Sequence, residues 1–322
     1  MSGLGAVVTG GAGFIGGHLV GRLLRESWGV VVVDDFSSGR LENVPGDGSV
    51  VVVREDLREP VRLREVLEDC DVVFHLAANP EVRVGETDPG VHYGRNVAAT
   101  FSLLEVLRKV RRGKMVVFAS SSTVYGEASV IPTSEGYAPL IPISTYGASK
   151  LACEALLSAY CHTYGHRGLI LRFANVIGPG SNHGVVSDFV KKIRANSGEL
   201  EVLGDGTQEK SYLYVEDCIE AVMHVTSRFL KSVERVDVFN VGSSDKISVS
   251  KIGRIVAEEM NVPGIRLRFT GGVDGGRGWK GDVKTMLLST DKLSGTGWKV
   301  KHTSEQAVRL TARALSNVGS VD

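Results

Sequence analysis

A tyrosine and a lysine four positions apart form the pair in this sequence best suited to acid–base chemistry. Tyr146 and Lys150 enclose the segment Tyr-Gly-Ala-Ser-Lys, and on a helix they share one face. A phenol titrates at about pH 10, but a neighbouring ammonium would favour the phenolate. The pair predicts a tyrosine general base whose pKa is lowered by a lysine. Because this spacing is common in helices, the interpretation depends on the surrounding motifs.

A run of hydroxyl side chains precedes this pair. Ser120, Ser121 and Ser122 end an apolar stretch and are followed by Thr-Val-Tyr-Gly. A hydroxyl from this run could share a substrate oxygen with Tyr146 and hold it for proton transfer. The serines and the tyrosine together therefore predict a catalytic site acting on a hydroxyl or carbonyl group.

A glycine-rich turn near the N-terminus predicts a dinucleotide site. Between an apolar run and a helical pattern the chain reads Gly-Gly-Ala-Gly-Phe-Ile-Gly, which allows a close approach of the backbone to a pyrophosphate at a helix N-terminus. Its expected contacts are Gly10, Gly13, Phe14, Ile15 and Gly16. A plain strand-to-helix turn is the alternative for this motif alone.

An acidic residue at the expected offset supports that interpretation. Asp34 lies eighteen positions after Gly16 and would accept hydrogen bonds from the adenosine ribose. Its carboxylate would repel a 2′-phosphate, which favours NAD over NADP, whereas Arg40 in the following loop is the contrary indication. Other cofactor contacts are expected near the ends of the second, third and fourth strands, at Asp35, Ser38, Gly39, Asp56, Leu57, Leu76, Ala77 and Ala78.

The elements that must position these residues follow an alternating pattern. Short Val-rich runs predict strands over 5–9, 30–34, 50–54, 71–76, 115–120, 169–173 and 236–241. Helical periodicity predicts helices over 13–26, 62–68, 91–110, 144–164, 185–195, 215–230, 248–259 and 304–315. The pattern is typical of an α/β fold, a Rossmann doubly wound parallel sheet with a smaller, discontinuous C-terminal substrate domain. The expected domains are 1–174 plus about 214–242, and about 175–213 plus 243–322.

Composition excludes several classes of protein. Thirty-seven Lys and Arg residues balance thirty-seven Asp and Glu residues, which argues against a nucleic-acid or anionic-membrane partner. No apolar run approaches the roughly 20 residues of a membrane span.

The four cysteines form no CxxC motif, so we expect reduced thiols and a cytoplasmic protein. His162 and His166 have a metal-like spacing without a third ligand, and no metal is expected.

Together these motifs resemble the extended short-chain dehydrogenase/reductases that act on nucleotide sugars, most closely the UDP-galactose (UDP-glucose) 4-epimerases. The similarity covers nearly the whole chain, at Thr9 to Gly16, Asp34, Asp56, His75 to Ala78, Asn96, Ser120 to Gly126, Tyr146 to Lys150, Arg172 to Gly178 and Ser211 to Asp217. The resemblance implies a Rossmann domain with tightly held NAD and a C-terminal domain that binds a UDP-sugar. It also implies a homodimer joined through the helices expected over 91–110 and 144–164.

The resemblance also implies roles for single residues. Tyr146 is the catalytic base, Lys150 lowers its pKa and binds the nicotinamide ribose, and Ser121 is the catalytic serine, with Ser122 as a rival. Asn96, Ser120 and Phe173 are implied cofactor contacts. The implied substrate contacts are Ser121, Ser122, Tyr146, Asn175, Gly184, Val185, Lys210, Arg277 and Asp282. Lys210 replaces an arginine common in the family.

One missing acid selects among the family's reactions. Relatives that dehydrate or decarboxylate the sugar carry an acid two positions before the tyrosine of Val-Tyr-Gly, where this chain has Thr123. The expected reaction is therefore 4-epimerisation of UDP-glucose and UDP-galactose: Tyr146 takes the hydroxyl proton, hydride leaves C4 for NAD, the 4-keto sugar turns, and hydride returns to its other face. The alternatives are an NAD(P)-dependent keto-sugar reductase or dehydrogenase with net redox turnover, and a non-catalytic dinucleotide-sensing protein.

Overall fold

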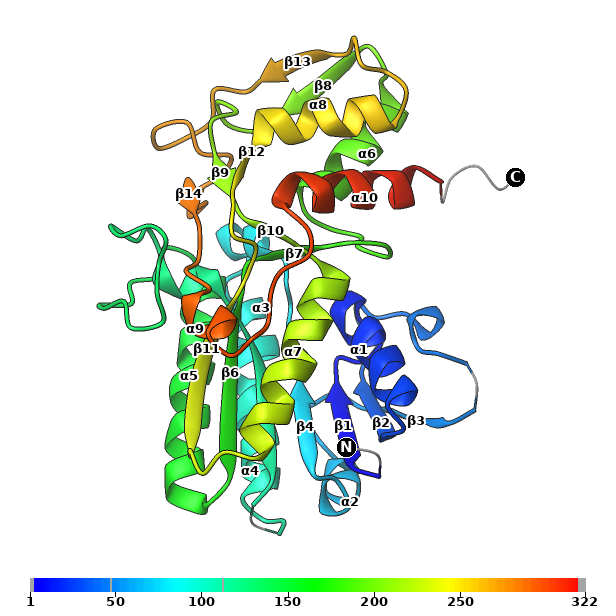
Figure 1. Cartoon of the computed structure of the whole chain (residues 1–322), viewed down its shortest axis with the longest axis vertical. Helices are drawn as coiled ribbons and strands as arrows, with labels where there is room; N and C mark the ends of the chain where they lie inside the picture. Colours follow the sequence, from blue (N-terminus) through cyan, green and yellow to red (C-terminus); the bar gives the residue numbers. More distant parts are fainter. Residues whose placement is uncertain (1–2, 47, 112, 318–322) are drawn as a thin grey trace. The chain divides into compact units, whose positions relative to one another are not determined.

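The largest sheet has seven strands, and its order is that of a doubly wound α/β fold (Figure 1). The computed structural model describes residues 3–46, 48–111 and 113–317. In spatial order the strands are β11 (Val236–Val241), β6 (Arg167–Phe173), β5 (Met115–Ser121), β4 (Val72–His75), β1 (Gly5–Thr9), β2 (Gly29–Asp34) and β3 (Val50–Arg54). The four pairings from β5 to β3 are parallel. The predicted Rossmann fold is confirmed.

Helices and short turns connect these strands. Valine-rich runs favour the strands because β-branched side chains suit a sheet that is buried on both faces. The connecting elements are α1 (Phe14–Arg25), η1 (Leu41–Asn43), α2 (Leu63–Glu68), η2 (Val82–Glu86), α3 (Gly90–His92), η3 (Tyr93–Ala98), α4 (Ala99–Leu107), η4 (Ser122–Tyr125), α5 (Thr145–Tyr164) and α7 (Val215–Leu230). The single helix predicted over 91–110 is in fact α3, the π-helical η3 and α4.

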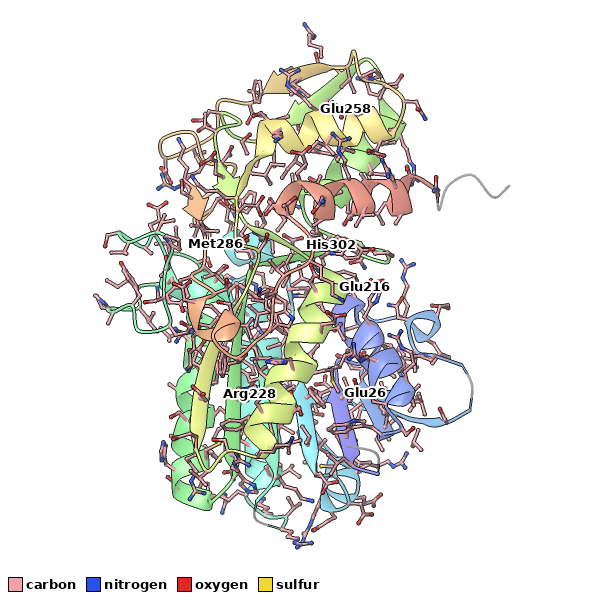
Figure 2. All side chains as sticks on the ribbon, viewed as in Figure 1. Glu26, Glu216, Arg228, Glu258, Met286 and His302 are labelled. Atoms are coloured by element: carbon pink, nitrogen blue, oxygen red, sulfur yellow. The ribbon has the colours of Figure 1, made fainter. Side chains whose placement is uncertain are left out.

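The chain divides into two compact units, whose side chains are drawn in Figure 2. Unit 1 consists of Met1–Val124, Thr145–Arg172 and Ile219–Phe239, and unit 2 consists of Tyr125–Ser144, Phe173–Cys218 and Asn240–Asp322. Residues 125–144 cluster with unit 2, although the sequence pattern grouped them with the Rossmann part. The reason is that this segment bonds to later parts of unit 2: the Thr133 amide donates to the Leu287 carbonyl oxygen at 2.9 Å, and Tyr125 donates to Asn240 Oδ1 at 2.7 Å.

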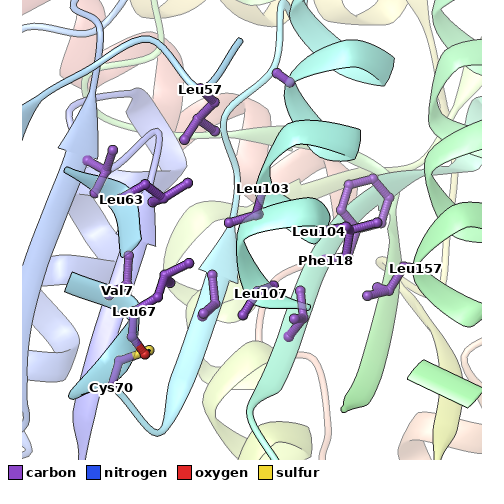
Figure 3. Close-up of a cluster of buried hydrophobic side chains, with 14 of the residues drawn as sticks. Val7, Leu57, Leu63, Leu67, Cys70, Leu103, Leu104, Leu107, Phe118 and Leu157 are labelled. Atoms are coloured by element: carbon purple, nitrogen blue, oxygen red, sulfur yellow. The ribbon is translucent and has the colours of Figure 1, made fainter. Parts of the chain in front are cut away.

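One face of the large sheet is covered by α2, α4 and α5. Their apolar residues and those of the strands form one buried cluster, part of which is shown in Figure 3. Leu67 of α2, Leu103 of α4 and Leu157 of α5 are each at most 1% exposed. Burial of this area stabilises unit 1 and fixes the helices against the sheet.

Unit 2 is built from short strands and three longer helices. Its strand pairs are β7 (Asn175–Ile177) with β10 (Tyr212–Tyr214), β8 (Glu199–Val202) with β13 (Arg266–Phe269), and β9 (Glu209–Lys210) between β12 (Ile247–Ser248) and β14 (Thr285–Met286). Its helices are α6 (Val185–Ala195), α8 (Val249–Glu259), α9 (Asp291–Ser294) and α10 (Ser304–Asn317), and α6, α8 and α10 share a second buried cluster. Within the described part of the chain, every helix is too short or too polar to cross a membrane.

Candidate active site

Tyr146 and Ser121 meet where strand β5 ends and helix α5 begins. Ser121 is the last residue of β5, Tyr146 is the second residue of α5, and their hydroxyl groups share a hydrogen bond. Ser121 Oγ also accepts from the amide of Thr123 at 3.2 Å and from Thr123 Oγ1 at 2.9 Å. A hydroxyl has one proton and two lone pairs, so Ser121 has its proton left to donate to the phenol oxygen. This donation favours the phenolate form of Tyr146.

Lys150 lies one turn further along α5, on the same face. Its ammonium donates to the carbonyl oxygen of Ala119 at 2.8 Å and lies 5.9 Å from the centre of the Tyr146 ring. Burial lowers the pKa of Lys150 to about 8. Burial also raises the pKa of Tyr146 to about 12, against the effect of the Ser121 hydrogen bond. A base at neutral pH therefore needs more positive charge near the phenol than the protein alone supplies.

A buried ion pair supports this arrangement from behind. Glu154, one turn beyond Lys150, accepts a hydrogen bond from Ser120 Oγ at 2.5 Å and pairs with Arg172 on β6 at 2.6 Å. The Glu154 and Arg172 side chains are each 6% exposed. The pair thus joins α5, β5 and β6. Ser120, an expected cofactor contact, directs its hydroxyl to this pair.

His92 packs on the other side of the phenol. Its ring centre lies 5.6 Å from that of Tyr146, and its nitrogens contact Thr145 Oγ1 at 2.8 Å and the Glu81 carbonyl oxygen at 3.1 Å. These contacts restrict the first turn of α5, so His92 helps to orient Tyr146.

The glycine-rich turn is a tight cradle between β1 and α1. A Cβ atom on Gly10 would lie 2.6 Å from the Ala77 amide nitrogen, and one on Gly16 would lie 2.1 Å from the Gly10 carbonyl oxygen. Helix α1 begins after Gly13, which has no side chain to cap it, and its first turn holds no acid. Unsatisfied N–H groups at such a helix start attract an anion. Phe14 and Ile15 lie in that first turn, and Leu76, Ala77 and Ala78 follow β4 beside Gly10.

Asp34 lies at the tip of β2 next to this turn. Its carboxylate accepts hydrogen bonds from the amides of Ala12 at 2.9 Å and Phe36 at 2.8 Å. Burial raises the pKa of Asp34, although both hydrogen bonds oppose the shift. Gly39 also packs against the Asp34 carboxylate, since a Cβ atom on Gly39 would lie 2.9 Å from Asp34 Oδ1. Ser38 and Arg40, which flank Gly39, are exposed.

Four other expected cofactor contacts already have partners within the protein. Asp56 pairs with Arg58 at 2.6 Å, which lowers the pKa of that carboxyl, and Leu57 is buried in the core cluster. Asp35 pairs with Arg95 at 3.1 Å. The buried Asn96 accepts from the Asn79 amide at 2.8 Å and donates to Ser149 Oγ at 2.9 Å. Asn96 therefore links the segment after β4 to the helix that carries Tyr146.

Three of the expected substrate contacts form an ionic cluster in unit 2. Lys210 pairs with Asp282, which is 3% exposed, and the Lys210 ammonium lies 5.2 Å from the centre of the Trp279 ring. Arg277 pairs with Glu127, which lowers the pKa of the Glu127 carboxyl. Lys210 and Arg277 are distant in the sequence, but Asp282 acts on both of them within unit 2. Two cations of this kind suit a diphosphate.

The remaining expected substrate contacts occupy other places. Asn175 opens β7, where its amide side chain donates to the Ser211 carbonyl oxygen at 3.0 Å, and Phe173, an expected cofactor contact, ends β6. Gly184 has a φ of 87° and precedes Val185, the first residue of α6. Ser122 is buried at the start of η4.

Four residues near these groups were not predicted as site residues. Glu154 and Arg172 carry opposite charges in segments that read as buried, and such a charge in an apolar pattern is a signal that could have been used. Glu127 and His92 give no such signal, because only the fold brings them to Arg277 and Tyr146.

Comparison with known proteins shows the family of this chain. The model of the NAD dependent epimerase/dehydratase family matches residues 6–242. A putative UDP-glucose 4-epimerase of Methanocaldococcus jannaschii is 29% identical over 97% of this chain and 98% of its own length. A crystal structure of a UDP-galactose 4-epimerase is 44% identical, with a TM-score of 0.85 and coverage of 98% of this chain and 99% of that one.

A second solved structure contains both a cofactor and a substrate. It is the UDP-glucuronic acid 4-epimerase of Bacillus cereus in complex with UDP-glucuronic acid and NAD, 27% identical with a TM-score of 0.85, over 98% of this chain and all of that one. The family match covers the glycine-rich turn, Asp34, Tyr146 and Lys150 together. This chain belongs to the NAD dependent epimerase/dehydratase family.

Proposed function

We propose that this protein is a nucleotide-sugar 4-epimerase that interconverts UDP-glucose and UDP-galactose through a 4-keto intermediate. The observation that carries the proposal is the hydrogen bond between Tyr146 and Ser121 beside the Lys150 ammonium. This arrangement suits proton exchange with a sugar hydroxyl, and the likeness to a UDP-galactose 4-epimerase supports that choice of sugar.

The residues of unit 1 fit NAD, the cofactor of the family. The turn at Gly10 and Gly16 has no room for a Cβ atom, α1 starts without a capping side chain, and Asp34 has lone pairs left for ribose hydroxyls. The glycine turn and the first turn of α1 would hold the pyrophosphate, Asp34 the adenosine ribose, and Lys150 the nicotinamide ribose. When bound, NAD supplies the redox chemistry at C4 of the sugar.

The protein's own residues manage the proton. In the proposed reaction the Tyr146 phenolate accepts the proton of the sugar 4′-hydroxyl and later returns it, so the protein ends each turnover unchanged. Ser121 holds the same sugar oxygen, and we assign it this role in preference to Ser122 because Ser121 bonds to Tyr146 whereas Ser122 is buried. Lys150 stabilises the phenolate by its charge. Lys210 and Arg277 would bind the diphosphate of the substrate.

Turnover of UDP-galactose without added reductant tests the proposal. We expect the purified protein to form UDP-glucose, detected at C4 by NMR, with NAD released only on denaturation. Tyr146→Phe should lower kcat by about 100- to 10,000-fold and leave the bound NAD unchanged, because the ring stays and only the proton acceptor is lost. Full activity in that variant would remove Tyr146 as the base.

Other outcomes would replace the proposed reaction or sugar. Consumption of NADH or NADPH in proportion to product would indicate a net reductase. Exclusive turnover of UDP-glucuronic acid or a UDP-N-acetylhexosamine would keep 4-epimerisation and change the substrate. A panel of UDP-sugars assayed at equal concentration separates these cases.

We also propose a cytoplasmic homodimer joined through η3, α4 and α5. Exposed apolar side chains on these helices support the dimer, since Tyr93 is 67% and Phe101 46% exposed. Four free buried thiols suit a reducing compartment. Light scattering of the wild type and of Phe101→Glu would test the dimer, which the added charge should dissociate.

A further inference from the structure

An ion pair joins two separate segments at the carboxyl edge of the large sheet. Arg95 Nη1 donates to Asp35 Oδ2 at 3.1 Å and to Ser37 Oγ at 2.6 Å. Asp35 Oδ1 in turn accepts from the amide of Ser37 at 2.9 Å and from its hydroxyl at 2.6 Å. These three residues, called the clasp below, form one closed set of hydrogen bonds within unit 1.

The order of the strands determines what the clasp spans. Arg95 lies on η3 in the segment that follows β4, and Asp35 and Ser37 lie in the loop that follows β2. In the sheet, β1 lies between β4 and β2, and the glycine-rich turn begins where β1 ends. The clasp therefore bridges from one side of that turn to the other, across the edge where ligands bind in open α/β sheets.

Both ends of the clasp are held in place. The neighbouring Asn96 is 1% exposed and bonded to Asn79 and Ser149, which anchors the backbone beside Arg95. The π-helical turn of η3 is a local widening of the kind that recurs at functional sites. On the other side Asp34 binds the Ala12 amide, which ties the β2 loop to the glycine-rich turn. The backbone segments on both sides are therefore positioned so that Arg95 and Asp35 can pair.

We propose that the clasp of Arg95, Asp35 and Ser37 closes over the adenosine half of bound NAD and slows its release. The proposal rests on the cofactor site proposed above but not on the identity of the sugar. An enzyme whose redox chemistry cancels within each turnover gains from keeping its cofactor, and a bridge across the crevice supplies a barrier to release. The cofactor would leave only when Arg95 parts from Asp35.

The exposure of the clasp sets the size of the expected effect. The Arg95 and Asp35 side chains are 35% and 30% exposed, so water screens their attraction. Pairs of this kind contribute little each, and the added Ser37 hydrogen bond increases the total modestly. Opening the clasp should accelerate NAD release by about three- to tenfold.

Exchange of bound NAD measures this barrier directly. The protein is purified with its NAD, mixed with an excess of the fluorescent analogue etheno-NAD, and sampled over time for NAD still bound. We expect about three- to tenfold faster exchange in Arg95→Met and in Asp35→Asn. Arg22→Met removes a comparable ion pair with Glu26 on α1 and should exchange at the wild-type rate. Raised salt should accelerate exchange in the wild type more than in Arg95→Met.

The double variant separates the clasp from direct contacts to the cofactor. If Arg95 and Asp35 act through each other, the double variant exchanges no faster than the faster single variant. If the increases in exchange rate of the two single variants multiply in the double variant, each side chain binds NAD independently and the clasp proposal is wrong. The proposal is also wrong if Asp35→Asn exchanges NAD at the wild-type rate. If every variant binds NAD and exchanges it at the wild-type rate, the clasp proposal is wrong and the proposed function is unaffected. A wild-type protein that takes up no NAD overturns the proposed function as well.

Discussion

At the scale of single residues, the charge of Lys150 is expected to control the pH range of activity. Lys150→Met removes a positive charge that lies 5.9 Å from the centre of the Tyr146 ring. Loss of a nearby positive charge is expected to disfavour a phenolate and so to raise the pKa of Tyr146. Because the phenolate is the active form in the proposed reaction, the acid limb of the kcat profile should move to higher pH, by about one unit or more. Activity at pH 7 should fall at least about tenfold. A profile of kcat against pH measures both.

A surface lysine provides the control for that profile. Lys231→Met removes an exposed charge after α7 and should leave the acid limb in place. An unmoved limb in Lys150→Met, accompanied by loss of bound NAD, would show that Lys150 serves only to hold the cofactor.

The chemistry-bearing residues were predictable from sequence to different degrees. Tyr146, Lys150 and Gly10 belong to short motifs that predict their proposed roles when the motifs are taken together, although the spacing of Tyr146 and Lys150 alone is common in helices. The choice between Ser121 and Ser122 required the structure, because β5 ends at Ser121 and Ser122 begins η4, and the sequence does not say which of the two hydroxyls meets α5.

At the scale of elements, the Glu154 and Arg172 pair holds three of them together. Arg172→Met would leave the buried Glu154 carboxylate with the Ser120 hydroxyl but without a compensating positive charge, which costs about 3–5 kcal/mol of the free energy of unfolding. Urea denaturation measures this loss. Replacing both residues by methionine removes the uncompensated charge as well, so the double variant should recover much of the stability. A double variant less stable than Arg172→Met would contradict this account.

An exposed pair gives the matched comparison. Arg108 pairs with Glu105 three residues earlier, at the end of α4, with 36% and 28% of the side chains exposed. Arg108→Met should lower the free energy of unfolding far less than Arg172→Met does, because water already screens that pair.

Elements were predictable where a pattern repeats within one segment. The Val-rich strand β3 and the amphipathic helix α6 match their predicted ranges. The two-residue strands β9, β12 and β14 were not predicted, because each exists only through hydrogen bonds to a partner distant in the chain. The π-helical η3 was predicted as ordinary helix. Its wider turn accompanies hydrogen bonds of the Asn96 side chain, and hydrophobic periodicity does not reveal such bonds.

At the scale of the whole molecule, buried thiols are expected to make the fold sensitive to alkali. Burial raises the pKa of Cys70 to about 11 and of Cys161 to about 12, and it also raises the pKa of Cys153 and Cys218. Unfolded thiols ionise at about pH 8.5, so the unfolded chain loses protons that the folded protein keeps. The free energy of unfolding should therefore fall above that pH, by about 1.4 kcal/mol per pH unit for each thiol.

Lys150 has the opposite effect on the pH dependence of the free energy of unfolding, but it is one group against four thiols. Its pKa is lowered to about 8 in the folded protein, so its contribution to stability rises with pH between about 8 and 10.5. One such group offsets about one of the four thiols. Urea titrations at pH 7.5, 9 and 10 should show the net loss, and Cys161→Ala should reduce its slope by about 1.4 kcal/mol per pH unit. An unchanged slope would exclude that thiol as a source.

The division into two units was only partly predictable. Loss of regular alternation after Asn175 indicated a second unit, and the return of β11 to the large sheet followed from its Val-rich pattern. Residues 125–144 join unit 2 through Thr133 and Tyr125, whose partners lie more than a hundred residues away in the sequence. Such pairings are set by the fold and leave no local pattern.

The position of β11 at one end of the seven-stranded sheet has a consequence for synthesis. Its neighbour β6 is made first, and much of unit 2 is translated before β11 emerges from the ribosome. During that interval β6 presents an unpaired strand edge to other nascent chains, a state prone to aggregation. Chaperone demand should therefore be greatest while the ribosome translates residues between β6 and β11, and a slow codon placed just after β6 would prolong that exposure.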